Sequence, residues 1–168
     1  MSEFDTALEK VLEREGGYTN HPADRGGATN MGILQRVYND WLHGRGMPWK
    51  DVRNLTRDEA REIYLANYWK PSRADELPEQ VRGIHFDSAV NHGLNRAAKL
   101  LQNAAGVEAD GNIGPVTLAA IARMAPDLLL ARYIAERYRF YGAIVNRDRS
   151  QLAFIVGWLN RMAEFSES

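Results

Sequence analysis

The sequence predicts a mostly α-helical fold with one small β-hairpin near its N-terminus. Apolar residues recur at helical spacing along most of the chain, whereas β-compatible and turn-forming residues gather in a single stretch, 18–34. The 168 residues, 45% of them hydrophobic, can bury the core of one domain, with or without a small helical subdomain. We therefore expect one helical globular chain with a single β element.

The first predicted helix covers residues 3–15. Phe4, Leu8, Val11 and Leu12 form one apolar stripe at helical spacing, and Gly16-Gly17 provides a glycine stop. The pieces "YTN" and "ATNMGIL" follow, around "DRGG", and predict a small β-hairpin or an irregular ribbon.

Helical spacing then continues to the C-terminus. Thr56 and Glu59 form a capping box that opens a helix through Trp69, and Pro115 suits the first turn of a later helix. The remaining predicted helices cover 35–45, 79–91, 95–105, 116–124, 127–146 and 150–165. We divide the chain into an N-terminal part, 1–85, and a C-terminal helical part, 86–168, and expect them to pack as one globular unit.

Composition excludes several functional classes. The formal net charge of −1 gives no support for nucleic-acid binding, and the lack of cysteine excludes disulfides, cysteine-ligated zinc and thiol nucleophiles. The four histidines show no metal-ligand spacing, so we expect neither a metal nor a cofactor. No apolar stretch approaches the ~20 residues of a membrane span, and the N-terminal segment has the pattern of an amphipathic helix, not of a secretory signal.

Glu15 is the first candidate catalytic residue. It continues the apolar stripe of the first helix and lies in the last helical turn. Partial desolvation and the negative end of the helix dipole both favour the protonated carboxyl group, which a general acid needs near neutral pH. The alternative is a solvated acid at a helix end, like Glu13.

The glycine-rich loop supplies possible partners for Glu15. Asp24, Thr29 and Asn30 lie on a segment that can fold back over the helix end. A protonated Glu on one side of a cleft, with a carboxylate and a hydroxyl or amide opposite, can cleave an acetal while the second group orients or deprotonates water. Alternatively, Asp24 caps a turn, and Thr29 and Asn30 are strand residues without substrate contact.

"EGGYTNHPADRGGATNMGI" (15–33) resembles the signature of glycoside hydrolase family 108, the N-acetylmuramidases found among phage lysozymes and endolysins. "NYWKPSRADELP" (67–78) and "FDSAVNHGLNRAAKLLQ" (86–102) agree with the family as well. From about residue 86, including "GVEADGNIGPVTLAAI", the chain is similar to the family's C-terminal helical segment, which is often described as a peptidoglycan-binding domain. The resemblance covers about residues 4–160 and implies a lysozyme-like helical fold.

By this resemblance Glu15 is the catalytic acid, and Asp24 and Thr29 complete the catalytic set. The wider phage-lysozyme group has five residues between its Asp and Thr, a spacing that Asn30 meets here and Thr29 does not. Successive strand residues face opposite sides, so the two residues compete for the cleft position. The family motif has Thr at 29, which favours Thr29, and we place Asn30 among the substrate-binding residues.

Aromatic and helix-end residues are further candidates for binding sugar. Tyr18 follows the catalytic Glu in the motif, and Tyr64, Tyr68 and Trp69 are candidates for stacking on sugar rings as well. Tyr64 and Tyr68 lie four residues apart on one helix face, a pattern that core packing more often explains. Asn91 and His92 lie at a helix end broken by Gly93, where side chains can reach a cleft. Asn91 is the better saccharide partner, because a lone His is more often structural.

Arginines are enriched between residues 121 and 149. The excess is three positive charges, from Arg123, Arg132, Arg137, Arg139, Arg147 and Arg149 against three acids. A solvated helix face explains such a run, and the alternative is attraction to an anionic wall polymer or outer-membrane surface.

The resemblance implies a muramidase that hydrolyses the β-1,4 bond between N-acetylmuramic acid and N-acetylglucosamine of peptidoglycan. We expect a monomeric phage endolysin, made in the host cytoplasm without a signal peptide, released by a separate holin and active on the wall in the periplasm. A bacterial protein exported by an accessory system is the alternative setting. The alternative functions are a non-catalytic wall-binding or secretion-regulating protein and a lytic transglycosylase; an amidase is disfavoured because no nucleophile or zinc site is evident.

Overall fold

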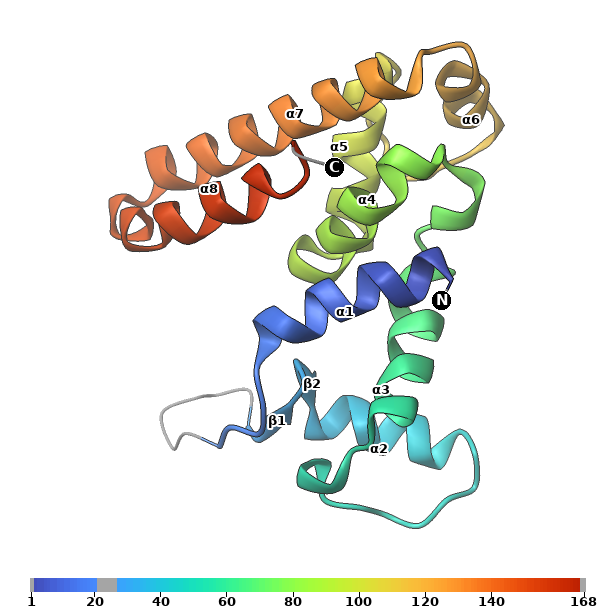
Figure 1. Ribbon diagram of the computed structural model, residues 1–168, viewed down its shortest axis with the longest axis vertical. Helices are drawn as coiled ribbons and strands as arrows, with labels where there is room; N and C mark the ends of the chain where they lie inside the picture. The colour runs from blue at the N-terminus through green and yellow to red at the C-terminus, as the bar shows by residue number, and fades with distance from the viewer. Residues whose placement is uncertain (1, 21–26, 167–168) are drawn as a thin grey trace. The chain divides into compact units, whose positions relative to one another are not determined.

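The computed structural model describes residues 2–20 and 27–166, and these form eight α-helices and one two-stranded sheet (Figure 1). The mostly α-helical fold with a small β-hairpin is thereby confirmed. The chain separates into two compact units, Met1–Asn67 and Tyr68–Ser168. The division that we placed after residue 85 falls inside a helix of the second unit.

In its described residues, 2–20 and 27–67, the first unit contains three α-helices and the hairpin. Its elements are α1 (Glu3–Glu15), β1 (Thr29–Asn30), β2 (Ile33–Leu34), α2 (Gln35–His43), the 3-10 turn η1 (Val52–Asn54) and α3 (Arg57–Tyr64). The capping box predicted for Thr56 and Glu59 is present at the start of α3, and Ser2 with Asp5 forms another at α1. The predicted stripe of α1 is buried, and α1 packs against α3.

The hairpin turns at Met31 and Gly32. Asn30 pairs with Ile33 and Thr29 with Leu34 across the antiparallel strands. Met31 and Gly32 have φ values of 50° and 74°, the two positive values that a tight type I′ hairpin turn requires. The hairpin therefore lies entirely within "ATNMGIL". The other predicted piece, "YTN", joins it through a single bridge between Thr19 and Thr29.

The second unit is a helical assembly built on α4. Its elements are η3 (Ala74–Glu76), α4 (Glu79–His92), α5 (Leu94–Ala105), α6 (Pro115–Ala122), α7 (Pro126–Arg147), η4 (Arg149–Phe154) and α8 (Ile155–Ala163). The helix predicted to run from 56 to 69 instead ends at Tyr64 and continues as a π-helical turn, η2 (Leu65–Trp69). Within residues 2–20 and 27–166, no helix combines the length and apolarity needed to cross a bilayer.

Helix α4 is buried on nearly every side. It packs against both α5 and α7, and α7 turns back through η4 into α8 (Figure 1). Because α4 has no solvated face along most of its length, its polar residues His85, Asp87 and Ser88 are buried as well. Buried polar groups require partners, so α4 places a hydrogen-bonding network in the core of this unit.

Candidate functional site

Glu15 is the last residue of α1 and is half-buried. The buried stripe of the helix ends one turn earlier, at Leu12, so the carboxylate lies where the packed face meets solvent. Gly16 follows with a φ of 72° and ends the helix. The position of Glu15 thus agrees with the prediction that this carboxylate lies in the last turn of the helix, directly before the loop.

The turn of the hairpin lies directly against Glu15. A Cβ atom built on Gly32 would stand 2.8 Å from Oε2 and 2.9 Å from Cγ of Glu15, closer than a packed carbon atom can approach. Gly32 also has the positive φ noted above, which disfavours any side chain. Only glycine allows the turn to contact the carboxylate in this way.

Tyr64 contacts the same turn. Its hydroxyl donates to the carbonyl oxygen of Met31 at 2.9 Å, and its ring is buried on α3. The hydroxyl would lie 2.6 Å from a Cβ at Gly32, so Tyr64 and Glu15 meet the same few atoms of backbone. We call Glu15, Met31, Gly32 and Tyr64 the acid site. The sequence pattern placed Tyr64 among the possible sugar-stacking aromatics, with core packing as the alternative, and did not assign Gly32 a role.

Thr29 and Asn30 face opposite sides of β1. The backbones of Thr29 and Thr19 exchange two hydrogen bonds of 2.9 Å, and their hydroxyl oxygens lie 3.3 Å apart. The buried Asn30 amide instead donates to the carbonyl oxygens of Val52 at 3.0 Å and Arg53 at 3.2 Å. Asn30 therefore anchors η1, and its Nδ2 is engaged in hydrogen bonds to this turn. The catalytic role of Thr29 stays a prediction.

Tyr18 is half-buried beside Arg53. The Arg53 guanidinium lies 4.6 Å from the centre of the Tyr18 ring, and its Nη2 donates to the phenol oxygen at 3.2 Å. One ring face is thus covered by a cation, and the sugar-stacking role of Tyr18 stays a prediction. Asp24 lies outside the described residues.

Trp69 is a core residue of the second unit. It is 2% exposed, its Nε1 donates to Asp75 at 2.7 Å, and its ring meets Phe86 edge to face at 5.4 Å. A buried ring offers no face to a sugar, which corrects the stacking role expected from the sequence. Tyr68, one residue earlier, is half-buried, and its substrate role stays a prediction.

Asn91 is engaged inside the second unit. Its Nδ2 donates to the carbonyl oxygen of Asp87 at 2.7 Å, and its Oδ1 accepts from Arg161. Both amide atoms are therefore paired, which argues against the saccharide contact that we expected of Asn91.

His92 belongs to a buried cluster on α4 and α7. Its Nε2 lies 3.3 Å from Nη2 of Arg137 and 3.4 Å from the hydroxyl of Tyr141. Burial and the positive charge of Arg137 lower the pKa of His92 to about 4, so the ring is neutral near pH 7. These contacts fit the structural alternative for His92 and not a substrate-binding role.

Arg137 is the charged centre of this cluster. It is fully buried and donates to the buried Asp87 carboxylate at 2.6 Å, whereas the other five arginines between 121 and 149 are exposed. The sequence pattern treated all six as one charge run, so it missed a buried ion pair between residues 50 positions apart. Within the described part of the chain, no group of three His, Cys, Asp or Glu side chains is placed to hold a metal ion.

Comparisons with known proteins match the chain to two family models, whose boundary lies after α4 and not between the two compact units. A family model described as "Glycosyl hydrolase 108" matches residues 8–93, which include the acid site, and one described as "Predicted Peptidoglycan domain" matches residues 96–163. Among the solved structures that match, the structure of Brucella abortus SagA is 38% identical with a TM-score of 0.78, and the alignment covers 96% of this chain and 90% of that one. A search of curated proteins found no match.

Proposed function

The chain belongs to the glycosyl hydrolase 108 family, and we propose that it cleaves the β-1,4 linkage between N-acetylmuramic acid and N-acetylglucosamine. As a member of this family, it is a glycoside hydrolase of the lysozyme type that acts on peptidoglycan. Glycoside hydrolysis requires a proton for the departing oxygen and a water molecule for the anomeric carbon. Two kinds of side chain must therefore meet the scissile bond.

Glu15 supplies the proton in this proposal. The Glu15 carboxyl group protonates the glycosidic oxygen as the bond breaks, and the Asp24 carboxylate accepts a proton from the attacking water. The hydroxyl of Thr29 helps to hold that water. If the reaction inverts the anomeric carbon, the two carboxyl groups are expected to lie about 6.5–9.5 Å apart to leave room for water.

The acid site is the observation that carries this proposal. A general acid works only if its carboxyl group is held in one orientation toward the leaving oxygen. The approach of Gly32 to Oε2 and Cγ restricts the Glu15 side chain, and the Tyr64 hydroxyl fixes the turn that makes this approach. If Glu15 were only a solvated acid at a helix end, neither contact would be expected.

Analysis of the fragments released from purified sacculi tests the proposal. We expect new reducing ends at muramic acid from the wild-type protein and none from Glu15→Gln. Release of 1,6-anhydro ends would identify a lytic transglycosylase, reducing ends at glucosamine would identify a different glycosidase, and no release at all would identify a wall-binding protein. Each of these three outcomes overturns the proposal.

The proposal extends to a phage endolysin as the biological setting. The substrate lies beyond the inner membrane, so this chain produced alone in a Gram-negative cytoplasm is expected to leave the cells intact. Coexpression of a holin, or fusion of a secretory signal, is expected to cause lysis that Glu15→Gln abolishes. Lysis by the unfused protein alone would contradict the holin-dependent setting but not the hydrolase activity.

A further inference from the structure

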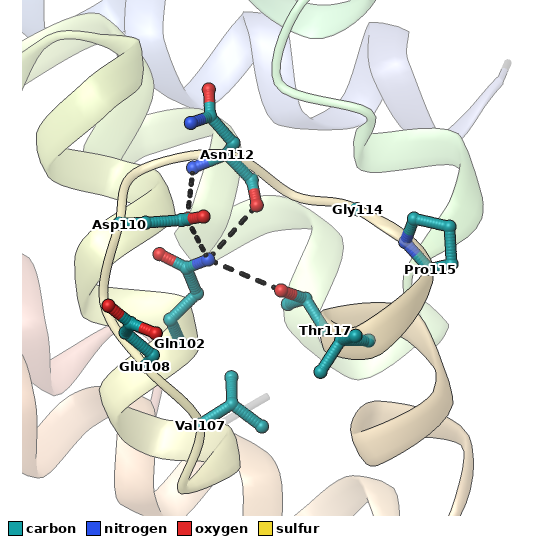
Figure 2. A pocket seen from close by; sticks show the side chains of 9 residues that line it. Gln102, Val107, Glu108, Asp110, Asn112, Gly114, Pro115 and Thr117 are labelled. Atoms are coloured by element: carbon teal, nitrogen blue, oxygen red, sulfur yellow. Dashed lines mark hydrogen bonds between the residues drawn. The ribbon is translucent and has the colours of Figure 1, made fainter.

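A pocket of about 270 Å³ opens in the second unit between the end of α5, the loop 106–114 and the start of α6 (Figure 2). It lies within the segment that matches the peptidoglycan domain model. Ligand pockets for drug-sized molecules measure about 300–1,000 Å³. This pocket is slightly smaller, which suits one amino-acid side chain better than a glycan segment.

Gln102 builds the wall of this pocket. The side chain is 1% exposed, and its Nε2 donates to Oδ1 of Asp110 at 2.7 Å, to the carbonyl oxygen of Asn112 at 3.0 Å and to the hydroxyl of Thr117 at 3.2 Å (Figure 2). Its Oε1 accepts from the backbone N–H of Gly111 at 2.8 Å. One buried amide thus ties the loop and α6 to α5 and defines the shape of the pocket.

The loop is also packed closely against α5. Gly111 has a φ of 88°, and a Cβ atom there would collide with the side-chain amide of Asn95. The loop that lines the pocket therefore contacts α5 at two places, Gln102 and Asn95. A binding site held in this way is preformed, which reduces the entropy lost on binding.

Negative charge and apolar surface meet in the pocket. Glu108 and Asp110 are its charged lining residues among those that the structure describes, and Val107, Pro115 and Val116 supply apolar surface. Asp110 also accepts from the backbone N–H of Asn112 at 2.7 Å. The hydrogen bonds from Gln102 and Asn112 lower the pKa of Asp110, so this carboxylate stays ionised at neutral pH.

We propose that this pocket binds the free amino group of the diamino acid in the peptide stems of peptidoglycan. Where this diamino acid is lysine, its side chain carries an ammonium group at the end of an aliphatic segment, which matches carboxylates beside apolar surface. The other ionised groups of a stem peptide are carboxylates, which the charge of the pocket repels. The inference rests on the proposed function and adds to it the group by which the second unit recognises the wall.

The charges of a neighbouring pocket explain why we assign the amino group to the first pocket. A pocket of about 400 Å³ also contacts Asn112, and Arg73 is its charged lining residue within the described part of the chain. The Arg73 guanidinium already donates to Glu76 and to the carbonyl oxygen of Ile113. This second pocket thus offers a cation no carboxylate among its described lining residues, whereas the first offers two.

A titration of the full chain with a soluble stem tripeptide, N-acetyl-L-Ala-γ-D-Glu-L-Lys, tests the proposal, because the side-chain ammonium is the one positive charge of this peptide. We expect saturable NMR shifts of the backbone amides in 106–117, and binding at least about fivefold weaker when the side-chain amine of the tripeptide is acetylated. Glu108→Gln is expected to weaken binding by a similar factor. Glu79→Gln, the same change at an exposed acid outside the pocket, is the matched control and leaves the affinity unchanged.

Equal affinity for the acetylated tripeptide, absence of saturable shifts, or equal weakening by Glu79→Gln would each overturn the assignment.

Calcium chloride is titrated separately, because two carboxylates in a loop can also attract a divalent cation. Saturable shifts with calcium that the tripeptide does not compete away would assign the pocket to a metal and also overturn it. Cleavage of sacculi is measured in parallel, so a failed titration with normal cleavage counts against the pocket alone, and lost cleavage with a normal titration counts against the hydrolase alone.

Discussion

Glu15 differs from its neighbour Glu13 in its surroundings and not in its chemistry. Glu13 is exposed, whereas Glu15 contacts the hairpin turn. Glu15→Gln keeps the shape of the side chain but cannot deliver a proton, and general acid catalysis contributes about 10² to 10⁴ in rate. We expect lysis of sacculi to fall by this factor while the thermal midpoint stays level or rises, because functional sites are often optimised at the expense of stability.

Glu13→Gln is the matched control for this substitution. It makes the same chemical change two residues away on an exposed position and is expected to retain wild-type activity. Turbidity of a sacculus suspension gives the rate, and differential scanning calorimetry gives the midpoint. Activity of Glu15→Gln within a few-fold of wild type would remove Glu15 from the mechanism.

Substitutions of Thr29 and of Asn30 are expected to affect activity and stability differently. Thr29→Ala removes a hydroxyl that faces away from the buried side of β1, and we expect it to lose at least about ten times more activity than Asn30→Ala. Asn30→Ala leaves the buried carbonyl oxygen of Val52 without this donor, which costs about 1–3 kcal/mol of unfolding free energy. Neither change is expected to unfold the protein.

Urea unfolding and the sacculus assay measure both quantities on the same two proteins. An equal loss of activity, or a larger loss for Asn30→Ala at unchanged stability, would contradict the assignment of the catalytic position to Thr29. The sequence could state this choice but not resolve it. Alternation along a strand says that the two side chains diverge, and the partner of Asn30 lies 22 residues away, beyond any local pattern.

The hairpin turn is the element that places backbone against the acid. Gly32→Ala would drive a methyl group into Glu15 and into the hydroxyl of Tyr64 at a positive φ, so the turn must shift. We expect activity to fall at least about tenfold, since small displacements of a catalytic group are costly. The strain is expected to cost about 1–2 kcal/mol of stability.

Gly27→Ala is the control for backbone strain alone. Gly27 has a φ of 80°, similar to that of Gly32, but a Cβ atom there would meet nothing within 4 Å. Gly27→Ala should therefore lose only the part of the stability that backbone strain costs, and only Gly32→Ala should lose most of its kcat on sacculus fragments. Equal kcat values for the two variants would show that the contact with Glu15 does not position the acid.

Elements defined by local signals were predictable, and elements defined by packing were not. The end of α1 at glycine and the capping box of α3 follow from residues within one turn of each other, and both are present. The π-helical turn after Tyr64 has no such local signal. It leaves Trp69 packed on Phe86, which the helical pattern alone could not reveal.

Different titratable groups have shifted pKa values in the two units. In the second unit, burial lowers the pKa of His85 to about 4, and burial together with Arg137 does the same for His92. In the first unit, burial of Glu59 raises its pKa, but hydrogen bonds from Thr56, Lys50 and Tyr38 outweigh this effect and lower it to about 2. The usual pKa values are 6.5 for His and 4.5 for Glu. The two units should therefore respond to acid in different pH ranges.

The sign of each response follows from proton linkage. Unfolded histidines bind protons below pH 6.5 while the buried ones stay neutral, so the second unit loses stability from pH 6.5 down to about 4. The interactions of Glu59 are complete above pH 4.5 and are lost only as the pH falls to about 2. Each unit of pKa difference corresponds to about 1.4 kcal/mol, so the two histidines together are expected to change stability by a few kcal/mol.

Hydrogen exchange, corrected for the intrinsic rates, distinguishes the two units between pH 6.5 and 4.5. We expect protection of the α4 amides to fall over this range while that of the α3 amides stays nearly constant. His92→Gln removes one of the two protonation sites and should flatten the loss in α4, whereas the same change at the exposed His43 should not. A parallel loss of protection in both units, or an unchanged slope in His92→Gln, would mean that protonation of the α4 histidines does not drive acid unfolding.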